Sequence, residues 1–148
     1  MSVQALIDTM LDEADLLDDL LDAVVEQRES VKSGDYDSMQ GLMKRVQGIS
    51  FRIHAKENQR AGLTESLSQE LGCEPHLSAL SQAVPEGERA LFLGAGDRLG
   101  HSVLALKSEM AILSGLVEHN ERFSAMLISE WRRLDADFTH SGGLDFRG

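Results

Sequence analysis

A row of carboxylates near the N-terminus is the first set of residues whose spacing could do chemistry. The acidic residues recur at steps of four and three, which places them along one face of a helix, opposite its apolar face. We expect a solvated face, with a docking surface for a basic partner as the alternative. A divalent cation site is less favoured, because carboxylates on one exposed face diverge into water instead of surrounding an ion. The row consists of Asp8, Asp12, Asp15, Asp19, Asp22 and Glu26.

A glycine-rich stretch from Ala90 to Gly100 has the composition of a dinucleotide-binding turn, in which glycines let the backbone approach a pyrophosphate at a helix N-terminus. Its glycines follow the pattern Gly-x-Gly-x-x-x-Gly, one residue off the common fingerprint, and no second strand completes a βαβ unit. We keep dinucleotide binding as the last alternative. We expect instead a frayed or kinked entrance to a helix.

The histidines and the single cysteine form no recognisable metal or catalytic site. No two histidines lie four residues apart, as a helical metal site requires. Cys73 and His76 could supply two zinc ligands, but no second pair accompanies them, so we expect a contact within a loop. Serine and histidine occur without a nucleophile-elbow pattern. We therefore predict no catalytic residues, no metal, no cofactor and no enzymatic activity. The histidines are His54, His76, His101, His119 and His140.

Composition narrows the class of protein further. The chain has 148 residues, one cysteine and a formal net charge of -11. This length suits one domain with a packed core, and a single cysteine suits a reducing cytosol. No basic residue precedes Arg28 and the longest near-apolar run is Ala90 to Ala95, so we expect no export signal and no membrane insertion. The negative charge disfavours nucleic acid as a partner.

The elements that carry these residues are predicted to be helices. A heptad seam from Val3 to Val31, interrupted only by Arg28, indicates a first helix over about 2–33. Further leucines widen its apolar surface, so we expect more than one neighbouring helix. Gly34 and Asp35 supply a stop and a start signal, and such a short link makes the next helix an antiparallel neighbour.

A second helix is predicted over about 36–71. Its apolar stripe runs from Met39 to Leu67 and is interrupted by Lys56 and Arg60, where we expect the stripe to reach water. The link over 72–86 contains both prolines of the chain, and it has room for a single helical turn at 76–83. Pro85 is well placed near the first turn of the following helix.

A third helix is predicted over about 88–139, followed by a tail at 140–148. Apolar residues alternate by four and three from Leu99 to Phe138, with Asn120 and Ser124 as consecutive polar exceptions on the seam. Unbroken, that stretch would be about 60 Å long, which is more than the other two helices could cover. We expect its C-terminal end to project, to bend or to meet a partner.

The C-terminal quarter carries the residues best suited to binding a protein partner. Its stretch from Phe123 to Phe138 holds the only tryptophan, two of the five phenylalanines and adaptable methionine, types that dominate interface hot spots. Intramolecular core is the alternative interpretation of the same face. A helix-in-groove or helix-on-bundle partner suits it. The predicted client-binding residues are Phe123, Met126, Leu127, Trp131, Leu134 and Phe138.

The chain resembles the FlgN-like flagellar export chaperones of bacteria. The resemblance lies in the leucine-rich segment from Leu16 to Asp35 with its Gly-Asp turn, in the second helix ending Ser68-Gln-Glu-Leu-Gly72, and in the late asparagine, Asn120. The family tail often ends in Tyr-Asp-x-x-Gly, whereas here Leu144 replaces the tyrosine.

This resemblance implies a cytosolic chaperone that binds the C-terminal helices of hook-filament junction proteins, the hook-associated proteins 1 and 3, and keeps them unassembled for flagellar type III secretion. It also implies client binding by the C-terminal region and delivery to the export gate. The expected fold is all-α, an antiparallel helical hairpin plus a long third helix in a coiled-coil-like bundle. The alternative is a self-associating coiled-coil adaptor without a client, and a homodimer stays open.

Overall fold

Residues 3–119 form a bundle of three long helices and one short one. The computed structural model describes residues 3–119, 129, 130, 132–134 and 136. Within these residues the helices are α1 (Val3–Ser33), α2 (Tyr36–Leu71), α3 (Leu77–Ala83) and α4 (Glu86–Glu118), and there is no strand. The predicted all-α class with an antiparallel hairpin and a long third helix is confirmed.

The turn between α1 and α2 has the geometry that its residues favour. Gly34 adopts a φ of +71°, which a side chain at this position would strain. Asp35 then caps α2, because its carboxylate accepts a 3.1 Å hydrogen bond from the Ser38 backbone N–H. The hydrogen bonds from Ser38 also lower the pKa of the Asp35 carboxyl. At the other end of α2, Gly72 adopts a φ of +69°.

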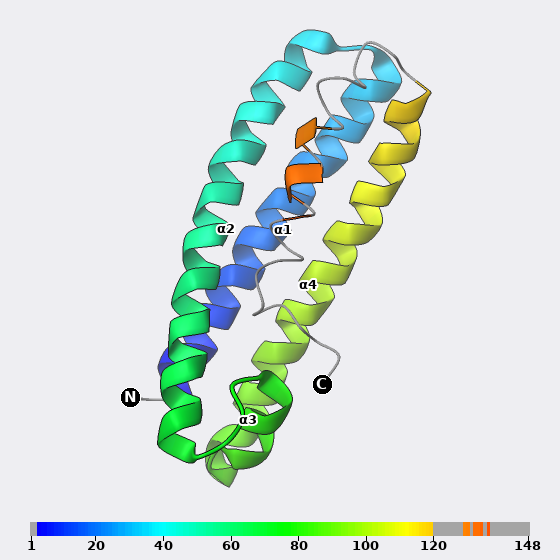
Figure 1. Cartoon of the computed structure of the whole chain (residues 1–148). Coiled ribbons are helices and arrows are strands. Elements are labelled where there is room, and N and C mark those ends of the chain that lie inside the picture. The colour runs from blue at the N-terminus through cyan, green and yellow to red at the C-terminus, as the bar shows by residue number, and fades with distance from the viewer. Residues whose placement is uncertain (1–2, 120–128, 131, 135, 137–148) are drawn as a thin grey trace.

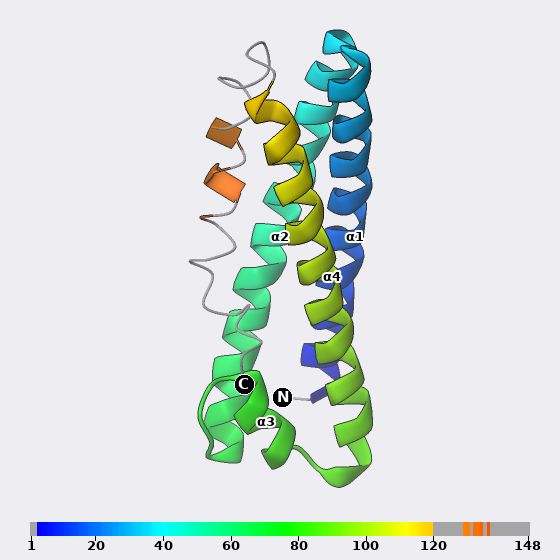
Figure 2. The same cartoon turned by 90° about the vertical axis from the view of Figure 1, so that its right-hand side faces the viewer.

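Helix α1 is the central element of the bundle. It packs along both α2 and α4, while α2 and α4 make few contacts with each other. Figures 1 and 2 show that α2 runs antiparallel to α1 and that α4 runs in the same direction as α1. The expectation that the first helix meets more than one neighbour is therefore correct.

The core follows the predicted seams over most of their length. Helix α1 has two buried sides, because it packs against both α2 and α4. Leu6 and Leu20, which lie outside the predicted heptad seam, are therefore buried as well. On α4 the seam residues are buried without exception up to Val117. The buried seam residues of α4 are Leu99, Val103, Leu106, Met110, Leu113 and Val117.

The link between α2 and α4 contains the short helix that the sequence suggested. His76 caps α3, since its ring nitrogen Nδ1 accepts a 3.4 Å hydrogen bond from the Ala79 backbone N–H. Leu80 anchors α3 in the core. Pro85 is the N-cap residue of α4. Glu86 and Glu88 lie in the first turn, where their negative charges are attracted to the positive end of the helix dipole.

Helix α4 is shorter than the helix predicted over 88–139. It ends at Glu118, with His119 as its C-cap. The described helical residues between 129 and 136 lie beside the bundle, between α2 and α4, and not beyond the end of α4 (Figures 1 and 2). Arg28 near the end of α1 pairs with Glu109, so α1 stops about one turn before α4 does. A straight extension of α4 would therefore have no helix to pack against. The predicted tail at 140–148 lies outside the described residues.

Candidate functional site

The predicted client-binding residues fall mostly outside the part of the chain that the structure describes. Of the six, only Leu134 is described, and its side chain is 2% exposed. Leu134 belongs to the same hydrophobic cluster as the buried residues of α1, α2 and α4. The interpretation as intramolecular core therefore holds for Leu134 in the free chain. Phe123, Met126, Leu127, Trp131 and Phe138 lie outside the described residues.

The acidic row of α1 is partly engaged in ion pairs with both neighbouring helices. On the side of α2, Lys56 Nζ lies 3.2 Å from Asp12 Oδ2 and Arg45 Nη1 lies 2.6 Å from Glu26 Oε2. On the side of α4, Asp15 pairs with Arg98. Asp8, Asp19 and Asp22 remain exposed and form no ion pair with a described residue. Half of the row therefore joins α1 to its neighbours, and the other half is the solvated face that we expected.

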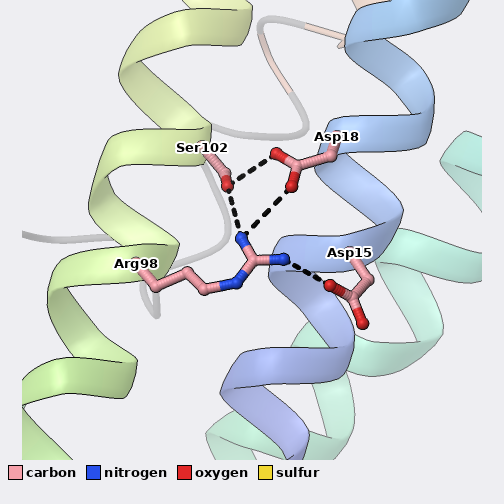
Figure 3. A network of polar contacts seen from close by, with 4 residues as sticks. All are labelled: Asp15, Asp18, Arg98 and Ser102. Carbon is pink, nitrogen blue, oxygen red and sulfur yellow. Dashed lines mark hydrogen bonds and ion pairs between the residues drawn. The ribbon is translucent and has the colours of Figure 1, made fainter.

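A polar network joins α1 to α4 near the middle of the bundle (Figure 3). Arg98 donates from Nη2 to Asp15 and from Nη1 to Asp18 Oδ2, the latter at 3.2 Å. The buried Ser102 hydroxyl donates a 2.8 Å hydrogen bond to Asp18 Oδ1 and accepts one from Arg98. One guanidinium thus holds two carboxylates one turn apart on α1, which sets how far α4 can slide along α1.

A buried ion pair lies inside the interface between α1 and α2. Arg60 Nε donates a 2.7 Å hydrogen bond to Glu13 Oε1, and the exposed fractions of these residues are 1% and 0%. The expectation that the stripe of α2 reaches water at Arg60 is wrong. Glu57 is also buried, and its side chain hydrogen-bonds the Glu13 carboxyl, so two carboxyl groups and one guanidinium lie together in the interior.

Burial raises the pKa of the Glu13 carboxyl above its ordinary value, and this effect outweighs the opposing attraction of Arg60 and the hydrogen bonds from Arg60 and Glu57. A cluster of two carboxylates and one guanidinium has one excess negative charge unless it binds a proton. The buried environment therefore favours the protonated form of this cluster in the folded state.

Sequence reasoning missed this cluster because Arg60 was predicted to reach water, and neither Glu13 nor Glu57 was among the candidate residues. The signal that could have revealed it is a repeat of seven residues on each helix. On α1 the repeat consists of Leu6, Glu13, Leu20 and Gln27, and the residues of α2 that face them have the same spacing. A negative charge in one such row and a positive charge in the other indicate a buried pair across an antiparallel hairpin. The facing row on α2 is Met39, Val46, Ile53, Arg60 and Leu67.

The glycine-rich stretch from Ala90 to Gly100 is neither a nucleotide-binding turn nor a frayed entrance. It is regular helix throughout, within α4, and the described residues contain no strand from which a βαβ unit could start. Dinucleotide binding is therefore wrong, because a helical backbone keeps its N–H groups in its own hydrogen bonds and cannot cradle a pyrophosphate.

The remaining candidates have local roles. Cys73 is half-buried against the core, and His76 caps α3, as the expected loop contact. Among the described residues, no group of three or more His, Cys, Asp or Glu side chains is arranged to hold a metal ion. Within the described part of the chain, no helix is both long enough and apolar enough to cross a membrane.

These features define a helical-bundle binding protein. Its described polar clusters join helices to one another, and its predicted partner-binding residues lie after α4.

The chain belongs to the FlgN family, described as FlgN protein, whose family model matches residues 1–139. Members are cytoplasmic, non-enzymatic chaperones that serve the hook-associated proteins FlgK and FlgL in flagellar export, and this chain is such a chaperone. The alternative of an adaptor without a client does not hold for this family. No curated protein and no solved structure matches the chain.

Proposed function

We propose that the chain binds the C-terminal helices of its clients through the apolar face after α4. The support is the concentration of large apolar side chains there, in a chain that otherwise uses few aromatic residues. An amphipathic client helix covered in this way loses the surface through which it would self-assemble, so binding keeps the client unassembled by mass action. The proposed residues are Phe123, Met126, Leu127, Trp131, Leu134 and Phe138.

Leu134 has a distinct part in this proposal because it is packed in the core of the free chain. A client can contact this side chain only if Leu134 exchanges its intramolecular packing for packing against the client. Client affinity is then reduced by the free energy of releasing Leu134 from the bundle. Substituting Leu134 would therefore weaken the bundle contact and the client contact together.

Calorimetric titration with a peptide of the client's C-terminal helix tests the proposed face. We expect Trp131→Ala and Phe138→Ala to weaken client binding by about tenfold or more each, as loss of a hot-spot aromatic does. Phe51→Ala is the matched control, because Phe51 is an exposed aromatic residue on α2 with 77% exposure. Unchanged affinity in both C-terminal variants, or equal loss in the control, would contradict the proposal.

Truncation after Val117 gives a second test of the same face. The shortened chain should lose client binding while α1 and α2 still form a helical hairpin by circular dichroism. Because truncation also removes Leu134 from the core, we expect a lower melting temperature as well. If the truncated chain kept its affinity for the client, the client site would lie on the bundle formed by the remaining helices.

We further propose that the chaperone delivers its client to the flagellar export gate. The family assignment supports this step, since an export chaperone must release its client at the secretion apparatus. A pull-down with the purified export-gate component, with and without client, tests it. Binding of the loaded chaperone is the expected result, and absence of binding in both states would contradict it.

We also propose that the chain forms a homodimer. The support is an exposed and nearly uncharged face of α4, on which Leu91, Leu93, Leu104 and Ile112 remain accessible. Sedimentation velocity across a range of concentrations tests this. Concentration-dependent association is expected, and a monomer at every concentration would contradict the proposal.

A further inference from the structure

The outer face of α4 differs from the solvent-exposed faces of α1 and α2 because it is almost free of charge. Leu104 on this face is 66% exposed, and Leu93 and Ile112 are 45% and 46% exposed. Figure 2 looks onto the side of α4 that faces away from α1, and no other labelled helix lies across it. A helix that is apolar on its exposed as well as its buried side is typical of a helix with a further partner. The other exposed uncharged residues of α4 from position 90 to position 115 are Ala90, Leu91, Gly94, His101, Ala105, Ser108, Ala111 and Gly115.

We propose that this face binds the same face of a second copy, with the two α4 helices antiparallel about a twofold axis. The proposal rests on the homodimer proposed above and specifies its interface. In this register Gly100 of one copy lies opposite Leu104 of the other, and the reverse contact follows by symmetry. About two turns further out, Leu93 lies opposite Ala111. Each large side chain thus meets a small one, which lets two helices approach closely.

The two charges on this face select the antiparallel direction. Asp97 and Lys107 are ten residues apart, about 15 Å along one helix, so they cannot pair within their own chain. Both are exposed, and neither forms an ion pair with a described residue. In the proposed register Asp97 of each copy lies opposite Lys107 of the other. A parallel arrangement would instead place each charge beside its own counterpart, which is repulsive.

A groove between α3 and α4 provides room for the inserted leucine. Its volume is about 410 Å³, and Gly100 and Gly96 line it on the side of α4. Without side chains at these two positions, the partner's Leu104 can reach the surface between the helices. The same groove is lined on the side of α3 by Leu77, Ser78 and Ser81. On the side of α4, Asp97 and His101 also line it. The partner side chain would therefore meet apolar and hydroxyl groups of α3, with the ionisable side chains of the groove all on α4.

Charge reversal tests both the existence and the register of this interface. We expect the wild-type chain to associate reversibly in sedimentation velocity at physiological ionic strength. Asp97→Lys or Lys107→Asp alone should raise the dimer dissociation constant about tenfold, because two attractive pairs become repulsive. The double variant restores opposite charges in the antiparallel register, so it should restore the wild-type dissociation constant.

Matched controls come from exposed charges on the other helices. Asp22→Lys on α1 and Lys44→Asp on α2 make the same changes in net charge at positions without an ion pair to a described residue. They should leave the dissociation constant within about twofold of the wild type. A dimer that is insensitive to the Asp97 and Lys107 variants, or a double variant that fails to recover, would overturn the interface while leaving a homodimer in place.

A client helix is the competing occupant of this face. Photo-crosslinking from position 104 in the full chain distinguishes it, because a second copy and a client peptide give products of different mass. A crosslinked dimer supports the proposal, whereas a monomer whose position 104 crosslinks to the client peptide overturns it. Client affinity measured on the same variants keeps the two proposals separate, since Asp97→Lys should not change client binding through the residues after α4.

Discussion

Arg60 and Glu13 form a fully buried ion pair between α1 and α2, in which Arg60 Nε lies 2.7 Å from Glu13 Oε1. Both side chains occupy positions of the heptad rows through which the two helices face each other. Removing two charges from water is costly, so such a pair adds little net stability compared with apolar residues. Its consequence is specificity: a shifted register would leave at least one charge buried without its partner.

Replacing Arg60 should destabilise the bundle severely. Arg60→Met keeps a long side chain but leaves Glu13 and Glu57 buried without a cation, which we expect to cost about 3–5 kcal/mol in the free energy of unfolding. Lys56→Met is the control, because Lys56 forms a more exposed pair with Asp12 and should cost at most about 1 kcal/mol. Urea unfolding measures both. Losses of similar size in the two variants would show that Arg60 is not a buried partner.

Stability should fall as the pH rises above the ordinary pKa of a glutamate. The folded-state pKa of Glu13 is raised from 4.5, so the folded protein binds this proton more tightly than the unfolded chain does. The stabilisation is complete below pH 4.5 and is lost as the pH rises through the raised pKa. Glu13→Gln should flatten this part of the curve of unfolding free energy against pH. An unchanged slope in Glu13→Gln would assign the dependence to other groups.

Ser102 should contribute measurably to the contact between α1 and α4. Its buried hydroxyl bonds Asp18, so Ser102→Ala should cost about 1 kcal/mol in the free energy of unfolding. Ser108→Ala, at an exposed position of the same helix, should be neutral or slightly stabilising. Denaturant titration of both variants checks this. If Ser102→Ala behaves like Ser108→Ala, the network in Figure 3 does not hold the helices together.

Two glycines should respond to alanine in opposite directions. Gly34→Ala places a side chain at a φ of +71° and should cost about 1 kcal/mol. Gly48→Ala lies inside α2, where an added Cβ meets nothing within 4 Å, and should stabilise the protein by about 0.5–1 kcal/mol. Thermal unfolding of both variants measures the difference. A stabilised Gly34→Ala would mean that the turn does not require the left-handed conformation.

The helices and their turns could be predicted because their signals are local. The Gly34-Asp35 pair ends one helix and caps the next through contacts within a few residues, and both predictions are confirmed. The end of α4 could not be predicted in this way, since the apolar spacing continues past Glu118. Where α4 stops depends on where α1 stops, and that relation exists only after the two helices have packed.

The sequence by itself determined the all-α class, the hairpin, the apolar seams and the family, because these depend on spacing and on residue types read in order. Only the tertiary structure decided which charges are inside. Arg60 and Asp12 look alike as charged residues on amphipathic helices, yet Arg60 is buried with Glu13 and Asp12 pairs at the surface. The burial of a charge depends on its distance from a partner on another helix, and that distance is set by the register of packing.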